Sequence, residues 1–198
     1  MSALSLAGRV DAIVIGASAG GVEALMTLLP PLSESFGVPI FIVLHLPRDR
    51  PSLLAGIFSR KCHVTVCEAQ DKEPVRPGTV YFAPPDYHLL IDEGPQLCLA
   101  ADELVCHSRP SIDVLFESAA DIYGPRLLGI ILTGANEDGA EGLAAIHAAG
   151  GITVIQQPDS AQVKQMVVSA LIRNPGSHVL DLHGISALLR TLERDVAA

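Results

Sequence analysis

Two short stretches of the chain contain no polar side chain, residues 39–44 (PIFIVL) and residues 127–132 (LLGIIL). Runs this short and this apolar are typical of strands buried on both faces, as in a parallel sheet covered by helices. Residues 10–15 and 152–155 are also strand-like, and such stretches alternate with segments whose apolar side chains recur at helical spacing. The alternation predicts βαβ units. We therefore expect an α/β fold, a doubly wound and mostly parallel sheet with helices on both faces.

The remaining elements follow from the same patterns. Further strands are expected at residues 64–68, 79–83 and 179–180, and residues 88–92 and 96–100 predict a small antiparallel hairpin insertion across Glu93-Gly94-Pro95. Helices are expected over residues 20–29, 52–59, 111–122, 140–149, 160–172 and 185–194. No linker or repeat divides the 198 residues, so we expect a single domain over residues 1–198 with a core from about 11 to 190.

Composition excludes several classes of protein. Hydrophobic residues make up 49% of the chain, which predicts a large core. The net charge of −9 and the scattered basic residues argue against nucleic-acid binding. No apolar run is long enough to insert into a membrane and no signal peptide begins the chain, so we expect a cytoplasmic protein. Cys62, His63 and Cys67 lack a second pair of cysteines at ligand spacing, so we expect free thiols and no metal.

Three chemically active residues follow predicted strands. Ser18 follows the first strand within Gly16-x-Ser-x-Gly20, His45 follows PIFIVL directly, and Asp138 lies in the loop after LLGIIL. Because the carboxyl ends of parallel strands meet at one edge of a sheet, we expect the three side chains to lie close together. A serine hydroxyl needs a base such as imidazole, and a carboxylate orients that base, so the three predict an acyl-transfer triad. The Ala19 N–H, at the start of the next helix, is a candidate oxyanion donor.

Each residue also has a structural interpretation. Ser18 could be a turn or capping serine, and Asp138 could cap the helix that follows it. His178 and His183 compete with His45 as the base, but neither follows a long buried strand, and His183-Gly184 is typical of a loop. The glycine turn also allows a nucleotide-binding domain. However, the motif is not GxGxxG, and His45 stands where an acidic residue would end the second strand.

The motifs IGASAGG, VLHLP, TVYFAPPDYHLLI, HSRPSIDVLFESAA and ILTGANEDGAEGL resemble, in order, those of the catalytic domain of chemotaxis protein-glutamate methylesterases (CheB type) over about residues 11–189. The resemblance implies an α/β fold without a metal or organic cofactor. It also implies hydrolysis of glutamate methyl esters on chemoreceptors or related signalling proteins, with release of methanol, and deamidation of glutamines. Ser18, His45 and Asp138 match the catalytic serine, histidine and aspartate, and Ala19 the position after the nucleophile.

The chain departs from the family pattern in two places that bear on function. The family usually has LTG-Met-Gly-x-DGA, whereas Ala135 and Asn136 replace the methionine and glycine here, which alters a loop where Ala135 is a candidate oxyanion or substrate contact. About ten residues precede the first strand, so we expect a stand-alone form without a receiver domain, controlled by a separate partner if at all. The alternative hypothesis is a catalytically weak methylesterase-like module that binds signalling proteins.

Overall fold

The computed structural model describes residue 6 and residues 8–45 and 52–193. Seven strands form one sheet in the order β3-β4-β2-β1-β7-β8-β9, and every neighbouring pair is parallel. The strands are β1 (Ala12–Ala17), β2 (Ile40–Leu44), β3 (Thr65–Glu68), β4 (Thr79–Phe82), β7 (Leu127–Ile131), β8 (Ile152–Gln156) and β9 (His178–Leu180). The predicted α/β class and doubly wound parallel sheet are therefore confirmed.

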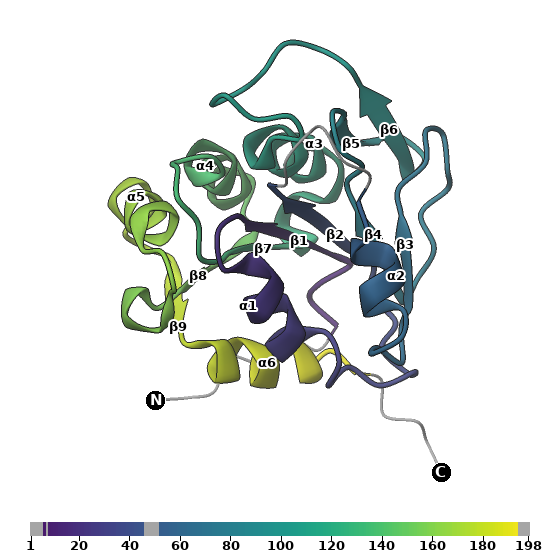
Figure 1. Ribbon diagram of the computed structural model, residues 1–198, viewed down its shortest axis with the longest axis horizontal. Coiled ribbons are helices and arrows are strands. Elements are labelled where there is room, and N and C mark those ends of the chain that lie inside the picture. Colours follow the sequence, from purple (N-terminus) through teal and green to yellow (C-terminus); the bar gives the residue numbers. More distant parts are fainter. Residues whose placement is uncertain (1–5, 7, 46–51, 194–198) are drawn as a thin grey trace.

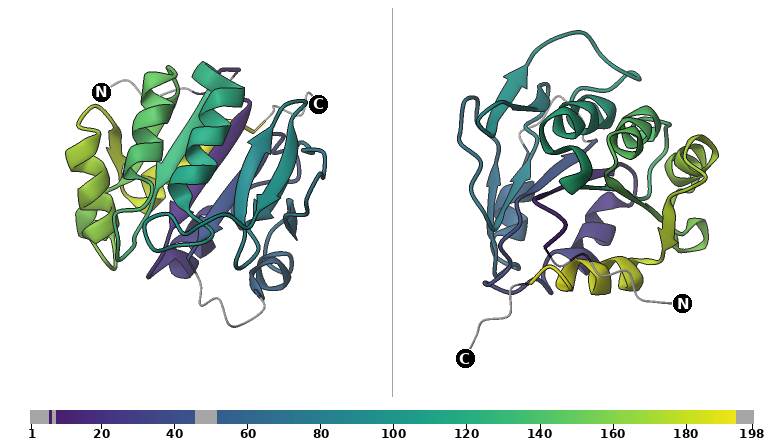
Figure 2. Two further views of the ribbon diagram at one scale, coloured as in Figure 1. Left: turned by 90° about the horizontal axis from the view of Figure 1, so that it is seen from above. Right: turned by 180° about the vertical axis from the view of Figure 1, so that it is seen from behind.

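Helices cover both faces of the sheet (Figures 1 and 2). One face carries α3 (Ile112–Tyr123), α4 (Ala140–Ala148) and α5 (Gln165–Arg173), which lie side by side in Figure 2. The predicted antiparallel hairpin is present as β5 (His88–Asp92) and β6 (Gln96–Ala100), and it packs beside α3. The other face carries α1 (Gly21–Leu28) and α6 (Leu182–Arg190), and α2 (Leu54–Phe58) packs against β3 and β4.

The all-apolar strands are buried on both faces because they separate two cores. Ile13 and Ile15 of β1 pack with the residues of α1 and α6, whereas Val14 packs in the second core with those of α3 and α4. Alternate side chains of a strand point to opposite faces, so a strand between two helical layers needs apolar residues at every position. This requirement explains the uninterrupted runs of β2 and β7.

Two predicted helix boundaries are wrong. The helix expected over residues 160–172 starts only at Gln165, because the preceding segment bonds to the loop after β7: Val163 N–H donates to Thr133 Oγ1, and Gly134 N–H to the Val163 carbonyl. The last helix starts at Leu182, so His183 and Gly184 lie in a helix, not in a loop. The Asp181 side chain caps this helix by accepting from Gly184 N–H at 2.7 Å.

The topology places the ends of β1, β2 and β7 together. β1 is the first strand in sequence and lies between β2 and β7. The strands after β1 are added on one side of it, and β7 and the strands after it are added on the other side. In open parallel sheets, ligands bind beyond the carboxyl ends of the strands at such a switch point. The segments that follow these three strands therefore define the region to search for a site.

Candidate active site

Ser18 lies one residue beyond β1 and is partly buried. Its N–H donates to the Thr133 carbonyl at 3.0 Å, and its carbonyl accepts from Gly21 N–H at 2.8 Å. Two residues before Ser18, position 16 has room only for a glycine, because a Cβ there would lie 2.4 Å from Cγ2 of Ile112 in α3. The glycine therefore lets the first turn of α3 approach the end of β1, directly beside Ser18.

His45 follows the last residue of β2 and continues its pairing with β1, since its N–H donates to the Ala17 carbonyl at 3.1 Å. The side chain is 13% exposed, and its Nε2 lies 2.9 Å from Oδ2 of Asp138. The histidine and the aspartate are therefore in contact at one edge of the sheet, as expected. Leu46 and Pro47, which complete the VLHLP motif, lie outside the described residues.

Asp138 is fully buried, and its carboxylate accepts four hydrogen bonds. Oδ2 accepts from His45 Nε2 and from Ile112 N–H at 2.7 Å, whereas Oδ1 accepts from the Ser111 hydroxyl at 2.8 Å and from Asp113 N–H at 3.0 Å. Asp138 thus binds the N-terminus of α3, where the helix dipole favours an anion. The interpretation of Asp138 as a cap of the following helix is wrong. The N-cap of α4 is Gly139, and no side chain caps it.

The surroundings of Asp138 determine which imidazole nitrogen carries a proton. Burial by itself raises the pKa of Asp138, but the hydrogen bonds from His45 and from the N–H groups of Ile112 and Asp113 outweigh burial and leave the pKa below its ordinary value. An ionised carboxylate only accepts, so Nε2 of His45 carries the hydrogen, and Nδ1 carries the lone pair that can act as a base. The orientation is the reverse of the common serine-protease triad, in which Nδ1 bonds the carboxylate.

Asn136 approaches the basic nitrogen of His45. Its Oδ1 accepts from Asp138 N–H at 3.3 Å, which orients the amide so that Nδ2 donates to His45 Nδ1 at 3.5 Å. The same Nδ2 donates to Ser108 Oγ at 3.4 Å. Within the described residues, the Ser18 hydroxyl makes no hydrogen bond to His45. Hydrogen bonds of catalytic groups often form only when substrate is bound.

Ala19 and Ala135 are both exposed near Ser18 and His45. Ala19 lies two residues before α1 rather than at its start, and its carbonyl accepts from Thr133 Oγ1 at 2.9 Å. Across the described parts of the chain, neither the Ala19 nor the Ala135 N–H has a hydrogen-bond acceptor. Ala135 lines a cavity of about 420 Å³ together with Cys106, His107, Asn136, Glu137, Val163 and Gln165.

Comparison with known proteins identifies the family of the chain. The family model described as CheB methylesterase matches residues 13–189, which is most of the chain. The chain belongs to the CheB methylesterase family. The matched range covers β2, β7 and all of β1 but its first residue, together with the positions of the three candidate catalytic residues.

Relatives within the CheB methylesterase family differ in length. A Leptospira interrogans protein named "Putative protein-glutamate methylesterase/protein-glutamine glutaminase" is 44% identical over 185 residues, covering 93% of this chain and 96% of its own. Protein-glutamate methylesterase/protein-glutamine glutaminase 2 of Caulobacter vibrioides is 36% identical, covering 96% of this chain but 56% of its own, so this chain spans about half of that relative. The crystal structure of the Thermotoga maritima CheB methylesterase catalytic domain aligns with a TM-score of 0.88 and 32% identity, covering 92% of this chain and 98% of that one.

Sequence reasoning missed the residues that support Asp138. The sequence pattern places Ser111 only at the start of the predicted helix over residues 111–122, whereas the structure shows that it is the N-cap of α3 and donates its hydroxyl to Asp138. Its N–H donates to Nδ1 of buried His88, which makes Nε2 of His88 the donor to the Glu103 carbonyl at 2.9 Å. Ser111 precedes an apolar helical pattern, which signals an N-cap. Nothing in the sequence indicates that His88 or Asp138 contacts it.

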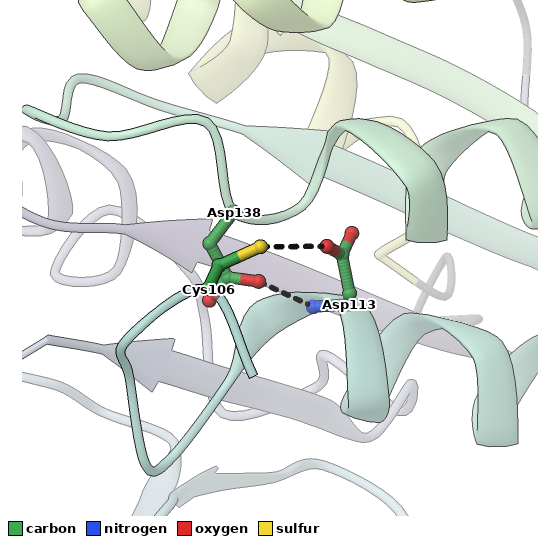
Figure 3. Close-up of side chains that lie close together, drawn as sticks. All are labelled: Cys106, Asp113 and Asp138. Carbon is green, nitrogen blue, oxygen red and sulfur yellow. Dashed lines mark hydrogen bonds between the residues drawn. The ribbon is translucent and has the colours of Figure 1, made fainter. Parts of the chain in front are cut away.

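The side chains of one cysteine and two aspartates lie close together, and one of the aspartates is the partner of His45. Cys106, Asp113 and Asp138 each place one ligand atom within 4.8 Å of the other two (Figure 3). Burial, followed by the charges of Asp138 and Asp113, raises the pKa of the Cys106 thiol to about 11, so the thiol is protonated at neutral pH and is a poor metal ligand. The oxygens of Asp138 are already engaged by four donors. The cluster therefore fits a hydrogen-bonded support for Asp138 better than a cation site.

Proposed function

We propose that this protein is a serine hydrolase that removes methyl groups from glutamate methyl esters of a chemoreceptor or related signalling protein. The observation that carries the proposal is the contact of His45 Nε2 with Asp138 Oδ2 at 2.9 Å, at the strand end next to that of Ser18. The family assignment and the methylesterase names of the relatives support the same reaction. The expected compartment is the cytoplasm. Within the described residues, no helix has the length and apolar character to span a bilayer.

In the proposed reaction, Ser18 Oγ attacks the ester carbonyl carbon while its proton moves to Nδ1 of His45. Asp138 stabilises the resulting imidazolium through the Nε2–H hydrogen bond. The oxyanion accepts from the N–H groups of Ala19 and Ala135. The intermediate collapses with cleavage of the bond to the methoxy oxygen, which takes the proton from Nδ1 and leaves as methanol.

The acyl-enzyme is then hydrolysed by the same groups. Nδ1 of His45 takes a proton from water, the oxygen attacks the acyl carbon, and Ser18 leaves with the proton returned by His45. The product is a glutamate carboxylate. A glutamine side chain would follow the same course with ammonia as the leaving group, which is the glutaminase reaction in the relatives' names.

The test is methanol release from methylated receptor preparations by the parent protein and by Ser18→Ala. The expected result is release by the parent and a loss of at least about 10³-fold in the variant, because a triad without its nucleophile retains only residual catalysis. Ser59→Ala is the matched control, since Ser59 is an exposed serine at the end of α2 whose hydroxyl donates to the Gly56 carbonyl of the same helix. Equal release by the parent and Ser18→Ala would disprove the role of Ser18.

A methylesterase-like binding module is the second candidate. Two observations favour it: the unpaired Ser18 hydroxyl among the described residues, and the Asn136 amide at His45 Nδ1. A fluorophosphonate probe distinguishes the two functions, because it captures only an activated serine. Labelling of Ser18 in the parent protein supports the hydrolase. Binding to receptor preparations without labelling or methanol release would support the module.

A further inference from the structure

The N-terminus of each of the helices α3 and α4 is bound by a carboxylate that belongs to the other helix or to the loop before it. Asp138 lies two residues before α4, but it binds the N-terminus of α3 through the N–H groups of Ile112 and Asp113. Asp113 lies in the first turn of α3, but its Oδ1 accepts from Gly142 N–H, in the first turn of α4, at 2.6 Å. Figure 3 shows Asp113 on α3 and Asp138 on the loop that leads into α4, joined by the bond from Asp113 N–H.

The close packing of α3 against α4 fixes these two carboxylate contacts in place. A Cβ on Gly142 would lie 2.6 Å from Cβ of Phe116 and 2.9 Å from Cα of Asp113, so the two backbones approach as closely as a glycine allows. Asp113 is 5% exposed and Asp138 fully buried. A change at Asp113 is therefore transmitted to Asp138 through short backbone contacts rather than through solvent.

Few positive charges compensate Asp113. The groups that face it are Cys106 before α3, Asp138 and Glu137 before α4, Glu117 on its own helix, and Glu141 and Arg173 around a shared cavity of about 380 Å³. Arg173 is engaged by both oxygens of Glu141, at 2.7 and 2.9 Å. Among the described residues around Asp113, the imidazole that bonds Asp138 is therefore the nearest group left to balance a second negative charge.

We propose that Asp113 is a positioning residue for the His45–Asp138 pair, and that loss of the proton from its carboxyl group strengthens His45 as a base. This proposal rests on the proposed function. An ionised Asp113 places a second negative charge behind Asp138, which favours the imidazolium form of His45. Burial, with a further contribution from the charge of Asp138, raises the pKa of Asp113 to about 7, so the change falls near neutral pH.

The first test is an NMR titration of the His45 imidazole in the whole isotope-labelled protein, in the parent and in Asp113→Asn. The amide keeps an oxygen for Gly142 N–H but removes the charge. We expect the His45 midpoint to move to lower pH by about 0.5–1 unit, as for a charge a few ångströms beyond a bonded neighbour. Asp121→Asn is the matched control. It removes an exposed carboxylate about two turns beyond Asp113 on α3, outside the groups that face Asp113, and should leave the midpoint unchanged.

A purely structural role would lower the melting temperature of Asp113→Asn without moving the titration, so superimposable His45 curves would overturn the proposal. If the variant does not fold, the Asp113 carboxyl carbon is titrated in the parent instead. A transition near pH 7 that also perturbs His45 supports the proposal, and a transition near pH 4 overturns it. The titration requires no catalysis, so its outcome is separate from the methanol and probe assays that decide the proposed function.

Discussion

At the scale of single residues, the amide of Asn136 contacts Nδ1 of His45. In the proposed reaction, Ser18 loses its proton to the same nitrogen. A hydrogen bond of 3.5 Å is long and contributes at most about 0.5–1 kcal/mol. We therefore expect Asn136→Ala to react about two- to fivefold faster with a fluorophosphonate probe, measured as the rate of Ser18 labelling.

The control for Asn136→Ala is Glu137→Gln, an exposed neighbour in the same loop whose side chain does not bond His45 within the described residues. Its labelling rate should equal that of the parent. Slower labelling of Asn136→Ala would contradict the prediction and mean that the amide holds the imidazole in position rather than competing for its lone pair.

At the scale of elements, the α3–α4 contact determines whether Asp138 is held correctly. Gly142→Ala places a methyl group against Phe116 Cβ and the Asp113 backbone, neither of which can rotate away. We expect a loss of about 2 kcal/mol in unfolding free energy, together with a reduced rate of Ser18 labelling. Gly56→Ala in α2 is the matched control: no atom lies within 4 Å of its Cβ, so helix propensity should leave stability unchanged or slightly increased. A well-tolerated Gly142→Ala would mean that the two helices can separate without consequence.

At the scale of the whole molecule, Asp113 and Asp138 give opposite dependences of stability on pH. The pKa of Asp113 is raised from 3.8 to about 7, so the folded state binds a proton that the unfolded state has lost, and this group's contribution to stability falls as pH rises from about 4 to 7. The pKa of Asp138 is lowered, so its contribution is present above about pH 4 and is lost on acidification.

Asp113→Asn should therefore be more stable than the parent at pH 8, by about 1 kcal/mol after allowance for coupling to Asp138, and nearly equal at about pH 4. Urea unfolding at the two pH values measures the difference. A stability difference between the variant and the parent that does not change with pH would show that Asp113 is already ionised throughout this range.

The sequence by itself determined the sheet and the place of the site. The spacing and the number of apolar residues are local properties, so PIFIVL and LLGIIL identify buried parallel strands without knowledge of their neighbours. Parallel pairing then brings the residues that follow β1, β2 and β7 to one edge of the sheet. The prediction of Ser18, His45 and Asp138 as one group depends only on this geometry and on their chemistry. Their catalytic roles stay predictions.

Only the tertiary structure decided how these groups are held. Asp138 caps α3 rather than α4, Ser111 and Asp113 are its supports, and Nδ1 rather than Nε2 of His45 is the available base. Each of these contacts joins residues about 25 or more positions apart. Local propensity carries no information on such pairs, because the choice between two helix N-termini depends on how closely α3 and α4 pack, and so on Gly142 and Phe116 together.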